Sequence, residues 1–190
     1  MKKFLFAALA LLCITGALSA QEKWYDVKSG ILKSVCDDGT TKTDITTWFD
    51  DFGDKQTTHQ ITHMPGDMGD VSFIIVFQGN KMFSINDYKK ESMESDRPKL
   101  NWINLPEKAI KDFKIEEVGK ETVLGRECTV FTYQEKQLMR MVTVKVWTWK
   151  GFVLKSEMRR GKRAVVTEPV SFTPNASIPS STFDPKTYLK

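Results

Sequence analysis

The two histidines of this 190-residue chain, His59 and His63, are four residues apart in the segment HQITH. On a helix this spacing binds zinc in the zincin motif, where a glutamate beside the first histidine is the general base. Gln60 stands in that position, and an amide cannot act as a base. The surrounding threonines also favour a strand. Zincin chemistry is therefore excluded.

In a strand His59 and His63 still share one face, and Met64 and Met68 follow closely. Imidazole and thioether ligands together suit copper, which is the metal-binding alternative. Two histidines on a solvated strand face are the more common arrangement, so we expect no metal site and no cofactor.

Nucleophilic and acid–base catalysis also lack a pattern in the sequence. There is no Gly-x-Ser-x-Gly turn to present a serine nucleophile. Cys128 shares a strand face with Arg126, but the pattern places no histidine beside it. The adjacent acids Asp37-Asp38 and Glu116-Glu117 lie in turn-like or exposed contexts, where no acid–base geometry is defined. We expect a protein that is not an enzyme.

The first 20 residues have the composition of a secretory signal peptide. Lys2-Lys3 precedes an apolar run from Phe4 to Leu18, and small residues end at Ala20. The run is shorter than the roughly 20 apolar residues of a spanning helix. We expect cleavage near Ala20, a single domain over residues 21–190 with no transmembrane segment, and a location in the periplasm or outside the cell.

Two cysteines, Cys36 and Cys128, remain after such a cleavage. In an oxidising compartment they either form a disulfide or lie apart as two separately buried thiols. A disulfide closing so long a loop contributes about 3–5 kcal/mol in the chain-entropy model. The Cα separation decides between the two, and sequence alone does not give it.

Charge argues against a nucleic-acid partner. The chain has 28 basic and 24 acidic side chains, a formal net charge of +4. Loss of Lys2 and Lys3 with the signal lowers this to about +2. So small an excess does not provide the basic surface that nucleic acids require.

The stretch Leu138–Phe172 has the pattern of an antiparallel meander of three strands separated by Gly151 and Gly161. Val142, Val144 and Val146 point to one side of the first strand, and Trp147 and Trp149 to the other. We expect the tryptophan side to be the functional one.

Elsewhere the sequence predicts further strands and one helix. Val71–Phe77 (VSFIIVF) is apolar on both faces, so we expect a central strand covered on both sides. Residues 89–101 are charged and contain Pro98, which predicts a long loop, either disordered or a lid. A short helix follows, with Asn104 as its N-cap and Pro106 in its first turn.

The predicted fold is mainly β, a curved antiparallel sheet forming a half-barrel, with one or two short helices over its concave face. With so few helices a curled sheet is incompletely filled, and aromatic side chains are available to line a cavity. We expect ligand contacts from Trp147, Trp149, Phe73, Phe77, Phe83, Trp48 and Trp102.

Four segments resemble those of a known superfamily. They are Tyr25–Leu32 (YDVKSGIL), Trp48–Gly53 (WFDDFG), Val123–Cys128 (VLGREC) and Val146–Lys155 (VWTWKGFVLK). With the signal peptide, they look like the small secreted Gram-negative proteins of the LolA-like (lipoprotein-localisation-factor-like) superfamily. The resemblance covers most of the mature chain. It implies a half-barrel whose concave face is closed by short helices or loops and binds acyl chains or other hydrophobic molecules.

Residues and resemblance together predict a periplasmic, non-enzymatic protein that binds a hydrophobic ligand, a lipid or an acyl chain, on the concave face of its sheet. The alternative is an envelope structural or interaction protein that binds a protein partner through a sheet edge or an aromatic patch.

Overall fold

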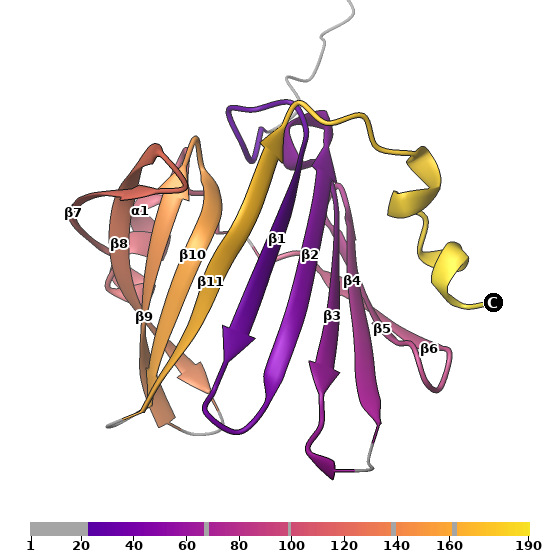
Figure 1. Ribbon diagram of the computed structural model, residues 1–190. Helices are drawn as coiled ribbons and strands as arrows, with labels where there is room; N and C mark the ends of the chain where they lie inside the picture. The colour runs from indigo at the N-terminus through magenta and orange to yellow at the C-terminus, as the bar shows by residue number, and fades with distance from the viewer. Residues whose placement is uncertain (1–22, 67–68, 99, 138–139, 161–162) are drawn as a thin grey trace, which may run out of the picture.

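The protein's structure, a computed structural model, describes residues 23–66, 69–98, 100–137, 140–160 and 163–190. The expected signal peptide, residues 1–20, lies outside the described residues. The part that is described belongs to one antiparallel sheet, its connections and a short C-terminal tail (Figure 1).

Eleven strands form the sheet, in two consecutive groups. The first group consists of β1 (Gly30–Asp37), β2 (Lys42–Asp50), β3 (Lys55–His63), β4 (Asp70–Gln78), β5 (Lys81–Asn86) and β6 (Glu91–Asp96). The second group consists of β7 (Glu116–Val123), β8 (Arg126–Gln137), β9 (Arg140–Trp149), β10 (Phe152–Arg160) and β11 (Arg163–Pro174).

The spatial order is β6-β5-β4-β3-β2-β1-β11-β10-β9-β8-β7. Each group is a meander, and the two groups join where β1 pairs with β11. The strands β6 and β7, which follow each other in the chain, therefore lie at opposite edges. Residues 97–115, here called the crossover, connect them and contain helix α1 (Glu107–Phe113). The sheet is curved, with the crossover on its concave side (Figure 1). The predicted half-barrel is confirmed.

The convex face is covered by the C-terminal tail, which contains the 3-10 turns η3 (Ser180–Phe183) and η4 (Pro185–Tyr188). Two hydrogen bonds fix it: the Thr57 hydroxyl donates to the Thr182 carbonyl at 2.7 Å, and the Gln78 amide to the Phe183 carbonyl at 2.7 Å. Tyr188 and Leu189 then pack over the buried side chains of Ile74, Val76 and Ile85. The tail therefore covers the convex face over β3, β4 and β5.

Strand β4 contains Val71–Phe77, which was predicted to be covered on both faces, but its concave face is partly exposed. Side chains alternate along a strand, so Phe73 and Phe77 face away from Ile74 and Val76. Phe73 is 37% exposed and Val71 on the same face is 52% exposed. The prediction for Val71–Phe77 was wrong about this face, because the crossover covers only one end of it.

A cluster of aromatic rings forms the main core where the two meanders meet. The rings of Phe49 and Phe152 are 4.6 Å apart, and those of Phe152 and Phe172 are 5.5 Å apart. Gly30 makes room for this stack, since a Cβ there would lie 2.7 Å from the Phe49 ring. The core joins the hairpin of β1 and β2 to that of β10 and β11, and the two hairpins are far apart in the chain.

Two local predictions need correction. Within the expected loop 89–101, Glu91–Asp96 forms β6, which pairs with β5 along its whole length. Its charged sequence hid it because an edge strand exposed on both faces has no apolar alternation. Helix α1 forms as predicted, but its N-cap is Pro106 in an extended conformation, with no side-chain cap from Asn104. A left-handed Lys114 ends the helix.

Candidate functional site

Two pockets lie on the concave face, on either side of the crossover. The inner pocket has a volume of about 310 Å³ and the outer groove about 600 Å³. Pro98 and Leu100 of the crossover line both. The crossover thus divides the concave space instead of filling it.

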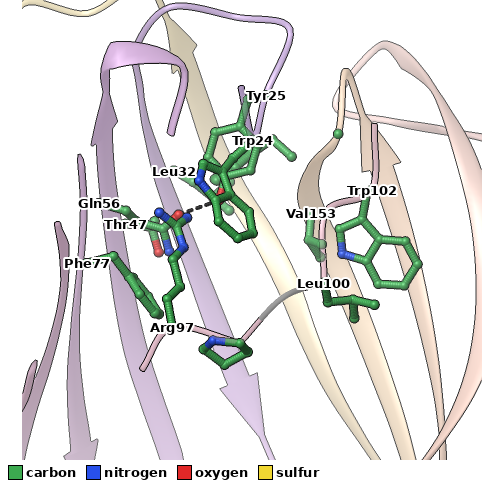
Figure 2. A pocket seen from close by; sticks show the side chains of 13 residues that line it. Trp24, Tyr25, Leu32, Thr47, Gln56, Phe77, Arg97, Leu100, Trp102 and Val153 are labelled. Carbon is green, nitrogen blue, oxygen red and sulfur yellow. Dashed lines mark hydrogen bonds between the residues drawn. The ribbon is translucent and has the colours of Figure 1, made fainter. Parts of the chain in front are cut away.

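The inner pocket is lined by both meanders and by the segment that precedes β1 (Figure 2). Its lining is Trp24, Tyr25, Leu32, Thr47, Gln56, Phe77, Arg97, Pro98, Leu100, Trp102, Gly151, Phe152 and Val153. The outer groove lies between α1 and β8, and its lining is Pro98, Leu100, Pro106, Lys108, Ala109, Asp112, Phe113, Tyr133 and Glu135.

Arg97 anchors the start of the crossover. Its backbone N–H donates to the Asn80 carbonyl at 2.9 Å, and its Nη1 donates to the Gly53 carbonyl at 2.8 Å. Its guanidinium carbon lies 3.8 Å from the centre of the Trp24 ring and 4.7 Å from that of Phe77. The side chain is 7% exposed. Stacking on two aromatic faces suits a planar delocalised cation.

The turn that receives Arg97 has an unusual backbone. Phe52 and Gly53 both have positive φ, 56° and 89°. A Cβ at position 53 would lie 2.5 Å from the Tyr25 ring, so only glycine fits there. The Phe52 carbonyl accepts from the backbone N–H groups of Trp24 and Tyr25. The turn therefore holds both the N-terminal segment and the crossover.

A second anchor follows a few residues later. The Asn101 side-chain amide donates to the Lys23 carbonyl at 2.9 Å. The Trp102 ring packs 5.2 Å from Phe131 and 5.7 Å from Tyr133, both on β8. Pro98 and Leu100, which lie between the two anchors in the sequence, form walls of both pockets.

The tyrosines of the two pockets are neutral hydrogen-bonding groups at ordinary pH. Burial raises the pKa of Tyr25 to about 12, although the charge and hydrogen bonding of Arg97 act in the opposite direction. The Tyr25 hydroxyl donates to Gln56 Oε1. Burial also raises the pKa of Tyr133 to about 12, and the charge of Glu135 adds to this.

Of the seven aromatic residues expected to contact a ligand, Phe77 and Trp102 line the inner pocket. Phe73 is on the same face of β4 as Phe77, four residues away. Trp48 and Phe83 lie on the convex face: Trp48 is adjacent to the pocket residue Thr47, and Phe83 packs with the tail-covered cluster.

Neither Trp147 nor Trp149 of β9 lines either pocket. Trp147 is 3% exposed, packs with Val130 and Leu154, and donates its indole N–H to Glu121 at 2.8 Å. Trp149 packs 5.7 Å from Phe172. The aliphatic face of β9 is instead the one that packs with Trp102 of the crossover. Alternation separates the two faces of a strand, but it does not tell which face the crossover covers.

Several of the pocket residues that the sequence did not predict are on the crossover, α1 and β8, among them Arg97, Leu100, Ala109, Phe113 and Tyr133. The expectation that residues 89–101 act as a lid came closest, since Arg97, Pro98 and Leu100 cover the concave face. No local pattern marks them, because they converge only through the long crossover.

The cysteines are free thiols, so the disulfide alternative is wrong. Cys36 is in β1 and Cys128 in β8, and β11, β10 and β9 lie between them in the sheet. Four strand spacings amount to roughly 19 Å along the sheet, against the less than about 7 Å that a disulfide allows between Cα atoms. Burial raises the pKa of the Cys128 thiol.

The histidines do not converge. Both are in β3, separated by about 13 Å along the strand. His59 Nε2 contacts the Ser72 hydroxyl at 2.8 Å, whereas His63 lies between Asp70 at 3.0 Å and Asp44 at 3.1 Å. Hydrogen bonds to Asp44 and Asp70 raise the pKa of His63. Among the described residues, which do not include Met68, no group of three or more histidine, cysteine, aspartate or glutamate side chains is placed to hold a metal ion.

The hydrogen bonds of His59, Ser72 and Asp87 do not run in the direction that a catalytic triad requires. The Ser72 hydroxyl also hydrogen-bonds Asp87, and Lys90 and Ser72 together lower the pKa of that carboxyl. A nucleophilic serine donates its proton to histidine. Here the Ser72 hydroxyl donates its hydrogen bond to the Asp87 carboxylate, so the same hydroxyl accepts from the N–H of His59 Nε2. The group lies on the convex face, away from both pockets.

The fold and the pockets define a half-barrel with a covered concave face. Residues 32–164 match the family model described as "Domain of unknown function (DUF4412)", and the chain belongs to this family. No curated protein matches it. Within the part of the chain that the structure describes, no helix has the length and apolar character needed to cross a membrane.

Solved structures share the fold at low identity. An uncharacterized conserved protein from Thermus thermophilus is 7% identical, with a TM-score of 0.52 over 83% of this chain and 84% of that one. The MucA/MucB complex of Pseudomonas aeruginosa gives 12% identity and a TM-score of 0.50, over 82% of this chain and 55% of that one. The chain thus spans about half of that protein. Lipoprotein LppX from Mycobacterium tuberculosis is similar at 10% identity over 81% of this chain and 90% of that one, with a TM-score of 0.40 that supports no argument.

These likenesses show that the chain shares its fold with these proteins. At such identities they leave the ligand to be argued from the geometry of this chain.

Proposed function

We propose that the protein is a non-enzymatic binding protein for a hydrophobic molecule, a lipid or another ligand with an acyl chain. The ligand occupies the outer groove between α1, the crossover and β8. The composition of the first 20 residues supports a periplasmic or extracellular location.

The observation that carries this proposal is the groove itself. Its volume of about 600 Å³ is in the range of small-molecule sites, and its walls are mainly apolar: Leu100, Pro106, Ala109 and Phe113. Burying an acyl chain there gains about 0.8 kcal/mol for each CH2 group. Lys108, Asp112 and Glu135 supply charged groups to the same groove, where a polar head can stay hydrated.

Helix α1 has more apolar surface than its own packing requires. Ala109 is its buried residue, while Ile110 and Phe113 are each 39% exposed. A seven-residue helix is marginally stable alone, so it depends on its contacts with the sheet. A bound chain would cover Phe113 and increase those contacts. Phe77 and Trp102 extend the apolar surface into the inner pocket.

A binding titration with a fluorescent fatty acid tests the proposal. Phe113→Ser removes a groove wall and should raise the Kd about tenfold or more, the loss expected for one large apolar contact. Tyr88→Ser is the matched control, because Tyr88 is 90% exposed and lines neither pocket. Equal affinities for the two variants, or no saturable binding by the unaltered protein, would reject the groove as the site.

A further inference from the structure

The two edges of the sheet are built differently. Strand β7 has an irregularity between Glu117 and Gly119, and Gly119 has φ of 136°. Such a bulge twists an edge and blocks further pairing. Strand β6 pairs with β5 in unbroken register, from Asn86 opposite Glu91 to Lys81 opposite Asp96. Its outer side therefore presents a regular row of backbone N–H and C=O groups.

The side chains of β6 give this edge a defined chemistry. Its sequence is ESMESD, with three acids and no base, and all three acids are exposed. Lys81 on β5 contacts Glu94 at 3.0 Å and Asp96 at 3.7 Å and offsets part of the charge. Met93 is 66% exposed and lies in a row with Ser84 and Ile75 on the concave face. The edge combines regular pairing, negative charge and one apolar contact.

We propose that β6 is a docking edge for an extended basic segment of a protein partner, which adds a strand to the sheet. Backbone hydrogen bonds to β6 supply the attachment. Lysine or arginine side chains opposite Glu91, Glu94 and Asp96 select the segment, and an apolar side chain covers Met93. This surface is separate from the proposed ligand groove, so the two proposals stand or fall independently.

A second copy of the chain is a poor occupant of this edge. Antiparallel pairing of β6 with a second copy brings the three acids of each strand together on neighbouring strands, and pairing centred on Glu94 places the two Glu94 side chains directly opposite each other. Like charges directly opposite each other on neighbouring strands are destabilising. The same acids that repel a copy attract a basic segment, which is how charge gives specificity at an edge.

The test uses a fluorescent eight-residue peptide of alternating lysine and valine, with fluorescence anisotropy as the readout. A second peptide of the same sequence carries N-methyl groups on all of its backbone nitrogens, which keeps its charge but removes the N–H donors from both of its edges. We expect the methylated peptide to bind about tenfold or more weakly. Hydrogen exchange should slow at the backbone amides of β6 when the unmethylated peptide is bound, and not at those of β7.

Matched variants locate the site. Glu94→Gln and Asp96→Asn on β6, whose side chains share one face, should each weaken peptide binding about two- to fivefold, the effect of one cross-strand charge pair. Glu117→Gln on β7 removes an equally exposed charge from the other edge and should leave binding unchanged. Absence of binding, equal binding of the methylated peptide, or equal losses at both edges would overturn the proposal. So would protection of β6 by rising protein concentration alone, which would assign the edge to a second copy.

Discussion

The two faces of the sheet are covered in different ways. On the convex face the tail residues Tyr188 and Leu189 pack directly over Ile74, Val76 and Ile85, which are at most 1% exposed. On the concave face the crossover touches the sheet mainly at two anchors, Arg97 and Trp102, and two pockets remain beside it. The closely packed tail stabilises the fold, whereas the crossover, held at two anchors, leaves room for a ligand beside it.

The largest effect should come from the close-packed face. Ile85→Ala leaves a cavity under the tail, because Ile85 is fully buried, and should lower the free energy of unfolding by about 2–5 kcal/mol. Binding of a fluorescent fatty acid to the folded variant should be unchanged. Urea unfolding and the binding titration measure the two quantities, and a joint loss would show that the faces are not independent.

Arg97→Ala should have the next largest effect, on the anchored face. It removes stacking on Trp24 and Phe77 and a charged hydrogen bond to the Gly53 carbonyl, an expected loss of about 2–3 kcal/mol. Hydrogen exchange at Ile103 should accelerate as the crossover loosens. Arg97→Lys keeps the charge but loses the planar stack, so its stability should lie between those of the unaltered protein and Arg97→Ala. Unchanged exchange in Arg97→Ala would contradict the role of Arg97 as an anchor.

Thr57→Val sharpens the comparison on the convex face with a smaller change. The substitution keeps the shape but loses the hydrogen bond to the Thr182 carbonyl, at a cost of about 1 kcal/mol. Urea unfolding should show this loss. Thr58→Val, one residue away on the other face, removes a threonine–threonine contact instead and should leave proteolysis of the tail unaffected. If the two variants expose the tail to protease equally, Thr57 does not fasten it.

The smallest expected effect is a pH dependence. Because the folded state raises the pKa of Tyr25 from 10.0 to about 12, it holds the proton more tightly than the unfolded chain. The resulting stabilisation is complete below about pH 10 and is lost as the pH rises towards 12. Tyr25→Phe should therefore lose less stability between about pH 9 and about pH 11 than the unaltered protein. The raised pKa of Tyr133 leaves part of the pH dependence of stability in both the variant and the unaltered protein. Identical pH slopes would contradict the assignment.

Sequence reasoning reached the fold because the meander of residues 138–172 and the other hairpins are local patterns. It missed β6, whose charged residues show no alternation, and it favoured the side of β9 whose tryptophans line neither pocket. Val146 and Trp147 necessarily point to opposite faces. Which of them meets the crossover depends on Trp102, more than 40 residues earlier in the chain. The placement of Arg97 against Trp24 and Phe77 is likewise set by topology and not by spacing.

Native mass spectrometry with solvent extraction, on protein purified from its own host, tests the central claim most directly. We expect a stoichiometric apolar mass that co-purifies with the protein and is lost in Phe113→Ser but retained in Tyr88→Ser. A clean mass of the chain alone, or a ligand retained equally by both variants, would contradict a hydrophobic ligand in the groove between α1 and β8.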